Sequence, residues 1–299
     1  MALQSSGAIS ISDIKTELGS SSNSLATLSV AAGKTQPHSM SEFYGYSAYS
    51  NVKYYRNDGT GDYVSGYSAS APFNINTTQD LTISMWVRPQ NVADQNHMMI
   101  NFGNTDSNGN NRLFISYTAN VNRIIARVRT NSVNFDRQWA LHDNTPQTGL
   151  SSTNAWSANN RGNTNAAGWT NLTITYDASA PEAEAAFKLY WNGSECQTTA
   201  SAANGTRTGI GANYFKIGEN LGGTNSGGNA YMDFDEIKVF SSVLSSATIS
   251  DIYNSGTIAD STQTTNKNLI TEWTFEGSNG ADSNSRYSGS ITNGIIVNH

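Results

Sequence analysis

From residue 52 onward, the chain is a series of short runs in which apolar and polar residues alternate, separated by turns rich in Gly, Asn and Asp. Alternation with a period of two is typical of β-strands, because successive side chains point to opposite faces. No long helical pattern separates the runs, so they predict an all-β fold in which two antiparallel sheets form a sandwich. The predicted strands read VKYYRN, DYVSGYS, LTISMWVRP, HMMINFG, RLFISYT, RIIARVRT, WTNLTITYD, FKLYWNG, YFKIGE, YMDFDEIKVF and LITEWTFEG.

Two of these runs carry further information. In LTISMWVRP, Leu81 begins an apolar face, whereas Thr82, Ser84 and Trp86 form the other face, which predicts one buried and one largely solvated side. RIIARVRT places Arg123, Arg127 and Arg129 among apolar residues. We expect these arginines to face solvent or the rim of the sheet, with binding of an acidic sugar or carboxylate as the alternative.

One helix is expected in this region, over LSSATISDIYNSG, with Ser245 as its N-cap and Gly256 as its end. The 299 residues leave room for one large β domain or two modest ones. The composition, with 13% charged and 10% aromatic residues, 26 Gly and 5 Pro, suits a β fold with many turns. The net charge of −6 and the scattered Lys and Arg disfavour nucleic acid and anionic membranes as partners.

Cys196 is the only cysteine, so no disulfide can form within the chain and a buried, inert thiol is expected. The N-terminus lacks the basic and apolar regions of a signal peptide, and no 18 apolar residues run together. We therefore expect synthesis in the cytoplasm and no insertion into a membrane.

The first 47 residues form a separate region with three short helical elements. Ser10 and Asp13 have the spacing of a capping box ahead of the first helix, which should end at Gly19. A second short helix should end at Gly33. The apolar residues of these two helices are Ile11, Ile14, Leu18, Leu25, Leu28 and Val30.

The third element lies in HSMSEFYGYS, where Ser39 and Glu42 again have the capping-box spacing. Isolated helices below ~12 residues are marginal in water, and the three elements are expected to bury too little surface to fold alone. We therefore expect them to pack on the β domain, or to dock on sister protomers or a larger assembly. The residues assigned to this anchoring are Ile11, Ile14, Leu18, Met40, Phe43, Tyr44 and Tyr46.

Several strands together resemble the LamG-like, concanavalin A-type jelly roll. NDGTGDYVSG resembles its opening strand, LTISMWVRP its Trp-bearing second strand, and WTNLTITYD and KLYWNG two later strands. DFDEIKVFSSVLSSATISDIYNSG resembles the closing strand and the helix after it. The resemblance spans most of residues 52–256 in the family's order and implies a jelly-roll sandwich over residues 48–299.

The N-terminal sequence resembles a second group of proteins. MALQSSGAISISDIKTELG, followed by PHSMSEFYGY, is similar to the opening segment of many structural proteins of tailed bacteriophages, especially marine ones. This implies a virion protein, as a tail fibre, baseplate appendage or capsid decoration. Residues 1–47 would anchor it to other virion proteins or its own copies, as a homo-oligomer, and the sandwich would be displayed on the exterior.

The C-terminal segment LITEWTFEGSNGADSNSRYSGSITNG resembles the sequence with which a LamG-like domain ordinarily begins, although here it lies at the end of the domain. Its face with Leu269, Trp273 and Phe275 should be buried. We expect the segment, within residues 268–299, to return and pair beside the first strands, since the termini of compact domains often lie close together. The rival is an exchanged strand that completes a neighbouring protomer.

Catalytic patterns are incomplete. Jelly-roll glycanases of the concanavalin type use carboxylates at E-x-D-x-E on one strand face. Here MDFDEI supplies Asp233 and Asp235, but Ile237 takes the next position. The four His show neither metal spacing nor a nucleophile partner. We therefore expect no catalytic residues and no enzyme, with a glycan hydrolase as the least favoured hypothesis.

Metal binding has weak candidates. DSNGNN, residues 106–111, lacks the glycine and glutamate positions of an EF-hand loop and reads as a polar hairpin tip. The family resemblance implies a Ca²⁺ position that maps to Asp58 and Asp235. We favour structural roles for both and expect no cofactor, with Ca²⁺ as the open alternative.

The function that we expect is host attachment by a lectin-like module that binds a surface glycan. The alternative is a purely structural decoration without glycan binding. Loops 104–111, 142–168 and 204–229 are long and rich in Asn and Gly, so ligand contact is expected there rather than on the sheet faces. The candidate ligand residues are Asn108, Asn110, Trp139, Trp156 and Tyr214.

Overall fold

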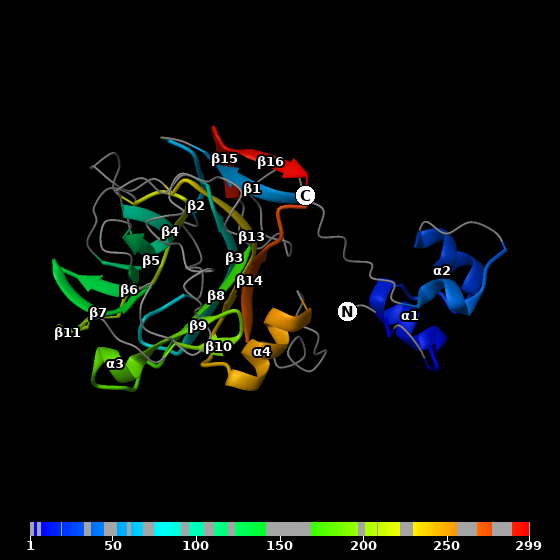
Figure 1. The fold of residues 1–299 in the computed structure, drawn as a ribbon, viewed down its shortest axis with the longest axis horizontal. Helices are drawn as coiled ribbons and strands as arrows, with labels where there is room; N and C mark the ends of the chain where they lie inside the picture. The colour runs from blue at the N-terminus through cyan, green and yellow to red at the C-terminus, as the bar shows by residue number, and fades with distance from the viewer. Residues whose placement is uncertain are drawn as a thin grey trace.

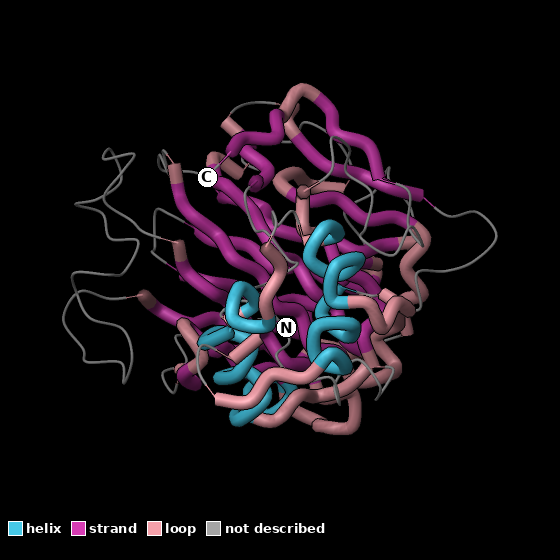
Figure 2. Tube along the Cα trace, turned by 90° about the vertical axis from the view of Figure 1, so that its right-hand side faces the viewer, coloured by secondary structure: helices cyan, strands magenta, loops and turns pink. Residues whose placement is uncertain are grey.

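The computed structural model describes residues 3–4, 7–18, 20–32, 37–44, 53–58, 61–67, 75–90, 96–104, 111–118, 123–141, 169–196, 201–207, 209–221, 230–255, 268–276 and 289–298. Two eight-stranded antiparallel sheets dominate this part of the chain, and the predicted all-β sandwich is confirmed (Figures 1 and 2). Helices accompany them only as short elements: α1 (Ile11–Leu18), α2 (Leu25–Ala31), η1 (Met40–Phe43), α3 (Ala183–Ala186) and α4 (Ser246–Ser255).

Sheet A has the strand order β10-β9-β8-β3-β13-β1-β16, and β14 pairs beside β13 in line with β1. Its strands are β10 (Ser194–Glu195), β9 (Phe187–Trp191), β8 (Thr170–Tyr176), β3 (Leu81–Pro89), β13 (Met232–Phe240), β1 (Lys53–Asn57), β16 (Ile295–Asn298) and β14 (Leu269–Trp273).

Sheet B has the order β11-β7-β6-β5-β4-β12-β2-β15. Its strands are β11 (Ser201–Asn204), β7 (Val133–Ala140), β6 (Arg123–Thr130), β5 (Arg112–Thr118), β4 (Asn96–Gly103), β12 (Tyr214–Ile217), β2 (Tyr63–Tyr67) and β15 (Gly289–Thr292). Several elements were not predicted: β7, whose apolar pattern is interrupted by Asp136 and Arg137, the short strands β10, β11 and β16, and the single-turn helix α3.

One hydrophobic core fills the space between the sheets. On β3 the odd positions, from Leu81 to Val87, all enter this core, as the alternation predicted. The opposite face of β3 departs from the prediction, because Thr82 and Ser84 are fully buried rather than solvated. Thr82 donates a hydrogen bond to the carbonyl oxygen of Ser242 (2.7 Å), in the connection that leads into α4.

Helix α4 explains much of this second buried layer. Thr248 N–H bonds the Ser245 hydroxyl oxygen (3.2 Å), so the predicted N-cap is confirmed. Ile249 and Ile252 pack with Tyr190 and Phe240 of sheet A. Its Tyr253 ring stacks on Trp86 of β3, with ring centres 5.8 Å apart. The outer face of sheet A is therefore closed where α4 lies (Figure 1).

The C-terminal segment completes both sheets within the chain. β15 pairs with β2, β16 with β1 and β14 with β13, so the expected return beside the first strands is confirmed. Trp273 and Phe275 enter the main core as predicted. Leu269 is only partly buried and Ile270 is buried instead, because the register shifts at Val239/Phe240 where β14 pairs with β13.

The N-terminal elements form a small core of their own. Ile14, Leu28 and Phe43 are fully buried, and their apolar neighbours lie between Leu3 and Met40. α1 and α2 lie side by side (Figure 1). The prediction that these elements need an outside surface to cover Ile14 and Phe43 is wrong, because the three elements cover one another.

Capping bonds fix the ends of these elements. Ser10 N–H donates to the Asp13 carboxylate (2.7 Å) while Asp13 N–H donates to the Ser10 hydroxyl (3.1 Å), which confirms the first capping box. The Glu42 carboxylate accepts bonds from Ser39 N–H (3.3 Å) and from the Ser29 hydroxyl (2.5 Å). Glu42 thereby ties η1 to α2.

The surface of this segment differs in part from the prediction. Val30 is 67% exposed and so does not contribute to the apolar face of α2. Ile11, Leu18 and Met40 pack against the small core, while Tyr44 is 44% exposed and donates from its hydroxyl to the Gly7 carbonyl (2.6 Å). Tyr46 lies outside the described residues.

Cys196 is buried in the main core, as expected. Burial, ahead of the nearby Glu195 carboxylate, raises the pKa of its thiol to about 12. Within the described residues, the structure contains no helix that is long and apolar enough to cross a membrane.

Candidate functional site

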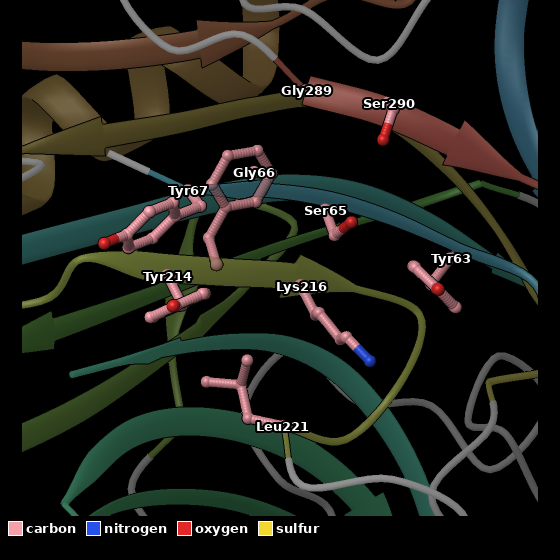
Figure 3. A pocket seen from close by; sticks show the side chains of 10 residues that line it. Tyr63, Ser65, Gly66, Tyr67, Tyr214, Lys216, Leu221, Gly289 and Ser290 are labelled. Carbon is pink, nitrogen blue, oxygen red and sulfur yellow. The ribbon is translucent and has the colours of Figure 1, made fainter. Parts of the chain in front are cut away.

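A pocket of about 440 Å³ lies on the outer face of sheet B, near the edge formed by β2 and β15 (Figure 3). Strand alternation creates it. Val64 and Phe215 point into the core, so their neighbours along β2 and β12 point outward. The pocket is lined by Tyr63, Ser65, Gly66, Tyr67, Tyr214, Phe215, Lys216, Leu221, Gly289 and Ser290.

Tyr67 and Tyr214 form the aromatic part of the pocket. The two residues are cross-strand partners, and their rings stack with centres 4.3 Å apart. Tyr67 is 50% exposed and Tyr214 is partly exposed. An exposed pair of rings is an apolar surface that carries polar hydroxyl groups at its margin.

Lys216 supplies the positive charge. Its ammonium group lies 4.3 Å from the centre of the Tyr63 ring and 2.8 Å from the Glu219 carboxylate. Ser65 is the cross-strand partner of Lys216 on one side and of Ser290 on the other. Hydroxyl and ammonium donors therefore lie next to the aromatic rings along two adjacent strand pairs (Figure 3).

A row of arginines continues this face across the sheet. Tyr67 pairs with Tyr214, Tyr214 with Gly103, Gly103 with Arg112, and Arg112 with Arg129. We call these five residues the tyrosine–arginine row. Because neighbouring strands lie ~4.8 Å apart, Tyr214 and Arg112 are roughly 10 Å apart at the backbone.

A second row of cross-strand partners lies beside the first on the same face, and its charged side chains are paired with carboxylates. Lys216 pairs with Asn101, Asn101 with Phe114, and Phe114 with Arg127. Arg127 donates from Nε to the Asp136 carboxylate (2.7 Å). The guanidinium groups of Arg112 and Arg127 both lie over the Phe114 ring, 4.6 Å and 5.4 Å from its centre.

The predicted ligand residues are distributed differently from the expectation. Tyr214 lines the pocket, but it belongs to strand β12 rather than to a loop. Trp139 is wrong as a surface candidate, because it lies on β7 with its ring buried in the main core. Asn108, Asn110 and Trp156 lie outside the described residues. The pocket itself lies on a sheet face. Within the predicted region 204–229, strand β12 supplies Tyr214, Phe215 and Lys216, and Leu221 follows it.

Sequence reasoning missed Tyr63, Tyr67 and Lys216 as pocket residues. The signal was present in DYVSGYS, where Tyr, Ser and Tyr occupy one face of a strand and Val occupies the other. A strand that presents two tyrosines on its outward face is unusual for a merely solvated surface, because exposed aromatic groups mark contact sites. The prediction assigned this run to the fold alone.

The carboxylates weighed for catalysis have other partners. Asp233 is buried and bonds Arg56 Nε (3.1 Å), Arg88 Nη2 (2.5 Å) and Gln90. Asp235 is buried and accepts from the Glu236 backbone N–H (2.8 Å), as its structural assignment predicted. Ile237 lies in the core.

Asp58 and Asp235 do not share a metal site. Tyr55 pairs with Phe234 in an antiparallel register, so Asp235 lies opposite Tyr54. Asp58 lies four residues beyond Tyr54, directly after the end of β1. At ~3.3 Å per residue this separates the two backbones by about 13 Å, which is too far for one Ca²⁺. Among the described residues, no group of three or more His, Cys, Asp or Glu side chains could hold a metal ion.

Comparisons with solved structures find matches at low sequence identity. A Bacteroides ovatus protein provisionally described as carbohydrate-binding superposes with a TM-score of 0.50 and 14% identity, over 83% of this chain and 60% of that one. The chain thus spans about three-fifths of the length of that protein. The CBM40 of a Ruminococcus gnavus sialidase, bound to α2,3 sialyllactose, gives a TM-score of 0.40 and 13% identity, over 69% of this chain and 100% of that one.

The binding domain of botulinum neurotoxin serotype D gives a TM-score of 0.44 and 14% identity, over 67% of this chain and 42% of that one. We found no curated protein with significant sequence similarity to the chain. The sequence profile of one family matches residues 58–250, which is more than half of the chain. The chain therefore belongs to the concanavalin A-like lectin/glucanases superfamily.

Proposed function

We propose that the protein is a lectin-like module that binds a glycan in the pocket on the outer face of sheet B. The observation that carries the proposal is the stacked pair of the exposed Tyr67 and the partly exposed Tyr214 beside Lys216. Sugars present an apolar ring face and a rim of hydroxyl groups. The pocket offers the matching surfaces, an aromatic platform bordered by hydroxyl and ammonium donors.

Binding without catalysis is part of the proposal. Hydrolysis of a glycosidic bond needs two carboxyl groups that flank it. The described residues that line the pocket include no Asp or Glu, and the nearby Glu219 carboxylate pairs with Lys216. The pocket therefore favours a binding role, and release of reducing sugar from any glycan that binds would contradict this.

We place this module on the exterior of a bacteriophage virion, where it would attach the particle to a host surface glycan. The support is the resemblance of residues 1–47 to the opening segment of tailed-phage structural proteins. The segment has its own buried core, and it leaves Val30 and Tyr44 exposed for contact with virion proteins or sister chains. A chain that starts at residue 49 is expected to stay folded and to lose incorporation into particles.

A glycan array tests the binding function. The intact protein is expected to bind a defined subset of glycans weakly, and Tyr67→Ala and Tyr214→Ala are each expected to abolish the signal. Tyr44→Ala is the matched control, since Tyr44 is similarly exposed but lies in the N-terminal segment. Absence of binding by the intact, folded protein would favour the purely structural decoration instead.

A further inference from the structure

The outer face of sheet B holds an excess of positive charge beside the tyrosine pocket. Arg112, Arg123, Arg127 and Arg129 all project from β5 and β6 on this face. Among the described residues of strands β4 to β7, the only carboxylate on the same face is that of Asp136, which bonds Arg127. The chain as a whole is acidic, so this local excess runs against its net charge of −6.

Arg129 stands out among the described arginines. Arg56 and Arg88 bond Asp233, Arg137 and Arg207 donate to backbone carbonyls, and Arg123 donates to the Gln138 side chain. Arg129, by contrast, has an Nε–H group without a hydrogen-bond partner in the described part of the structure, and Asp136, the carboxylate on this face of strands β4 to β7, bonds Arg127 instead. Its Nε–H group is buried, and a buried donor without an acceptor is unfavourable.

Besides Arg123, whose Nε–H is also buried without an acceptor among the described residues, Arg112 adds a further donor with the same deficit. It is 5% exposed, and its Nη1 group reaches Asn220 and the Leu221 carbonyl, while its Nε–H is buried without an acceptor among the described residues. Burial, followed by the charges of Arg129 and Arg127, lowers the pKa of Arg112 to about 10. An anion beside these groups would relieve both the charge repulsion and the missing hydrogen bonds.

The geometry points to an acidic glycan as the ligand of this face: one sugar stacks on Tyr67 and Tyr214, and a carboxylate-bearing neighbour along the same chain pairs with Arg129. This inference rests on the proposed glycan-binding function and names its substrate class. Guanidinium groups bind carboxylates in a planar, bidentate geometry that an ammonium group cannot reproduce. The register of the tyrosine–arginine row sets the spacing, because Tyr214 and Arg129 are three strands apart, or roughly 14 Å. That span suits an oligosaccharide rather than a single sugar.

Binding of galacturonic acid oligomers and of the same oligomers as methyl esters tests the inference in the intact protein. We expect the acidic form to bind at least tenfold more tightly. Arg129→Gln should remove this preference, and Arg129→Lys should restore only part of it. Arg123→Gln is the matched control on the same strand and face. Its Nε–H is also buried without an acceptor, but Arg123 donates to Gln138 and lies six residues from Arg129 along β6, so the variant should keep the preference.

The outcomes separate this inference from the proposed function. If Tyr214→Ala abolishes binding while esterified and acidic oligomers bind equally, glycan binding stands and the acidic assignment is overturned. A preference for sulfated over carboxylated oligomers also overturns the carboxylate assignment. If Tyr214→Ala leaves all binding unchanged, the proposed pocket fails.

A second measurement examines the arginine end alone. Free glucuronate is expected to raise the melting temperature of the intact protein and not that of Arg129→Gln, since a ligand stabilises the state that it binds. Equal shifts in both proteins would overturn the assignment of the carboxylate to Arg129.

Discussion

The outer faces of the two sheets both carry charged and aromatic side chains, but they differ in how the charged groups are paired. On sheet A the buried Lys238 lies 2.8 Å from Glu236 and 3.4 Å from Glu272, and Asp233 bonds two arginines. On sheet B, Tyr67 of the stacked tyrosine pair is exposed, and the buried Nε–H of Arg129 lacks an acceptor among the described residues. A polar face whose charges are all paired holds the fold together, whereas a face with unpaired donors is suited to an outside ligand.

Helix packing explains why the two faces diverge. Helix α4 lies over sheet A, so a polar side chain beneath it needs a partner within the protein. Ser84 meets this need by bonding Thr173 (2.9 Å) and Asn171 (3.3 Å). No residue of the described helices lines the tyrosine pocket of sheet B, so its side chains can be completed by a ligand.

The largest effect that we expect comes from removing residues 268–299. This deletion takes β14 and β16 from sheet A and β15 from sheet B, together with the buried Trp273 and Phe275. The open edges and lost core should leave a chain that aggregates or fails to unfold cooperatively, as measured by calorimetry and solubility. A deleted protein that melts at the temperature of the intact one would show that this segment is not part of the sandwich.

A matched pair of lysines sharpens the comparison between the faces. Lys238→Ala removes the ammonium group that pairs with the buried Glu236 carboxylate. It should lower the free energy of unfolding by ~3 to 5 kcal/mol. Lys216→Ala, on the more accessible face, should cost only about 1 kcal/mol. Denaturant titration measures both. Equal costs would mean that the two faces do not differ in how they stabilise the fold.

Lys238 also predicts a pH dependence. Burial alone lowers its pKa, but the Glu236 and Glu272 carboxylates outweigh burial and raise the pKa above the ordinary value of 10.5. A raised lysine pKa stabilises the folded state at neutral pH, and the contribution is lost only as pH rises through the folded value. The intact protein should therefore lose stability at strongly alkaline pH, and Lys238→Ala should lose less over the same range.

The next effect separates the two sides of strands β2 and β12. Tyr67→Ala removes one ring of the exposed stack and should cost about 1 kcal/mol of stability, although it abolishes glycan binding. Phe215→Ala lies on the inward side and should cost ~3 to 5 kcal/mol, because it empties part of the core. Comparable destabilisation by the two changes would assign Tyr67 to the fold.

The smallest effect concerns Cys196. Because burial raises the pKa of its thiol to about 12, almost no thiolate exists at pH 8. Alkylating reagents should leave the native protein unmodified and label it only after unfolding, as mass spectrometry can measure. Rapid labelling of the native protein would show that this edge of sheet A opens readily.

The fold was largely predictable, while the site was not. The alternation in LTISMWVRP identified the core-facing side of β3, and the capping residues Ser10 and Ser245 located the starts of two helices. Trp139 was misplaced because charged neighbours hid strand β7, although Arg137 is accommodated there by donating to the carbonyl oxygens of Glu184 and Phe187. A local pattern cannot show such distant acceptors.

The sequence by itself determined which residues alternate, where helices begin, and that the family is the concanavalin A-like one, because these follow from contacts between near neighbours and from motif order. Only the tertiary structure decided that Tyr67, Tyr214, Arg112 and Arg129 share one row. These residues lie far apart in the chain, and strand register brings them together. The same packing covers the outer face of sheet A and leaves the pocket of sheet B open, since burial depends on which elements lie above a sheet rather than on its own sequence.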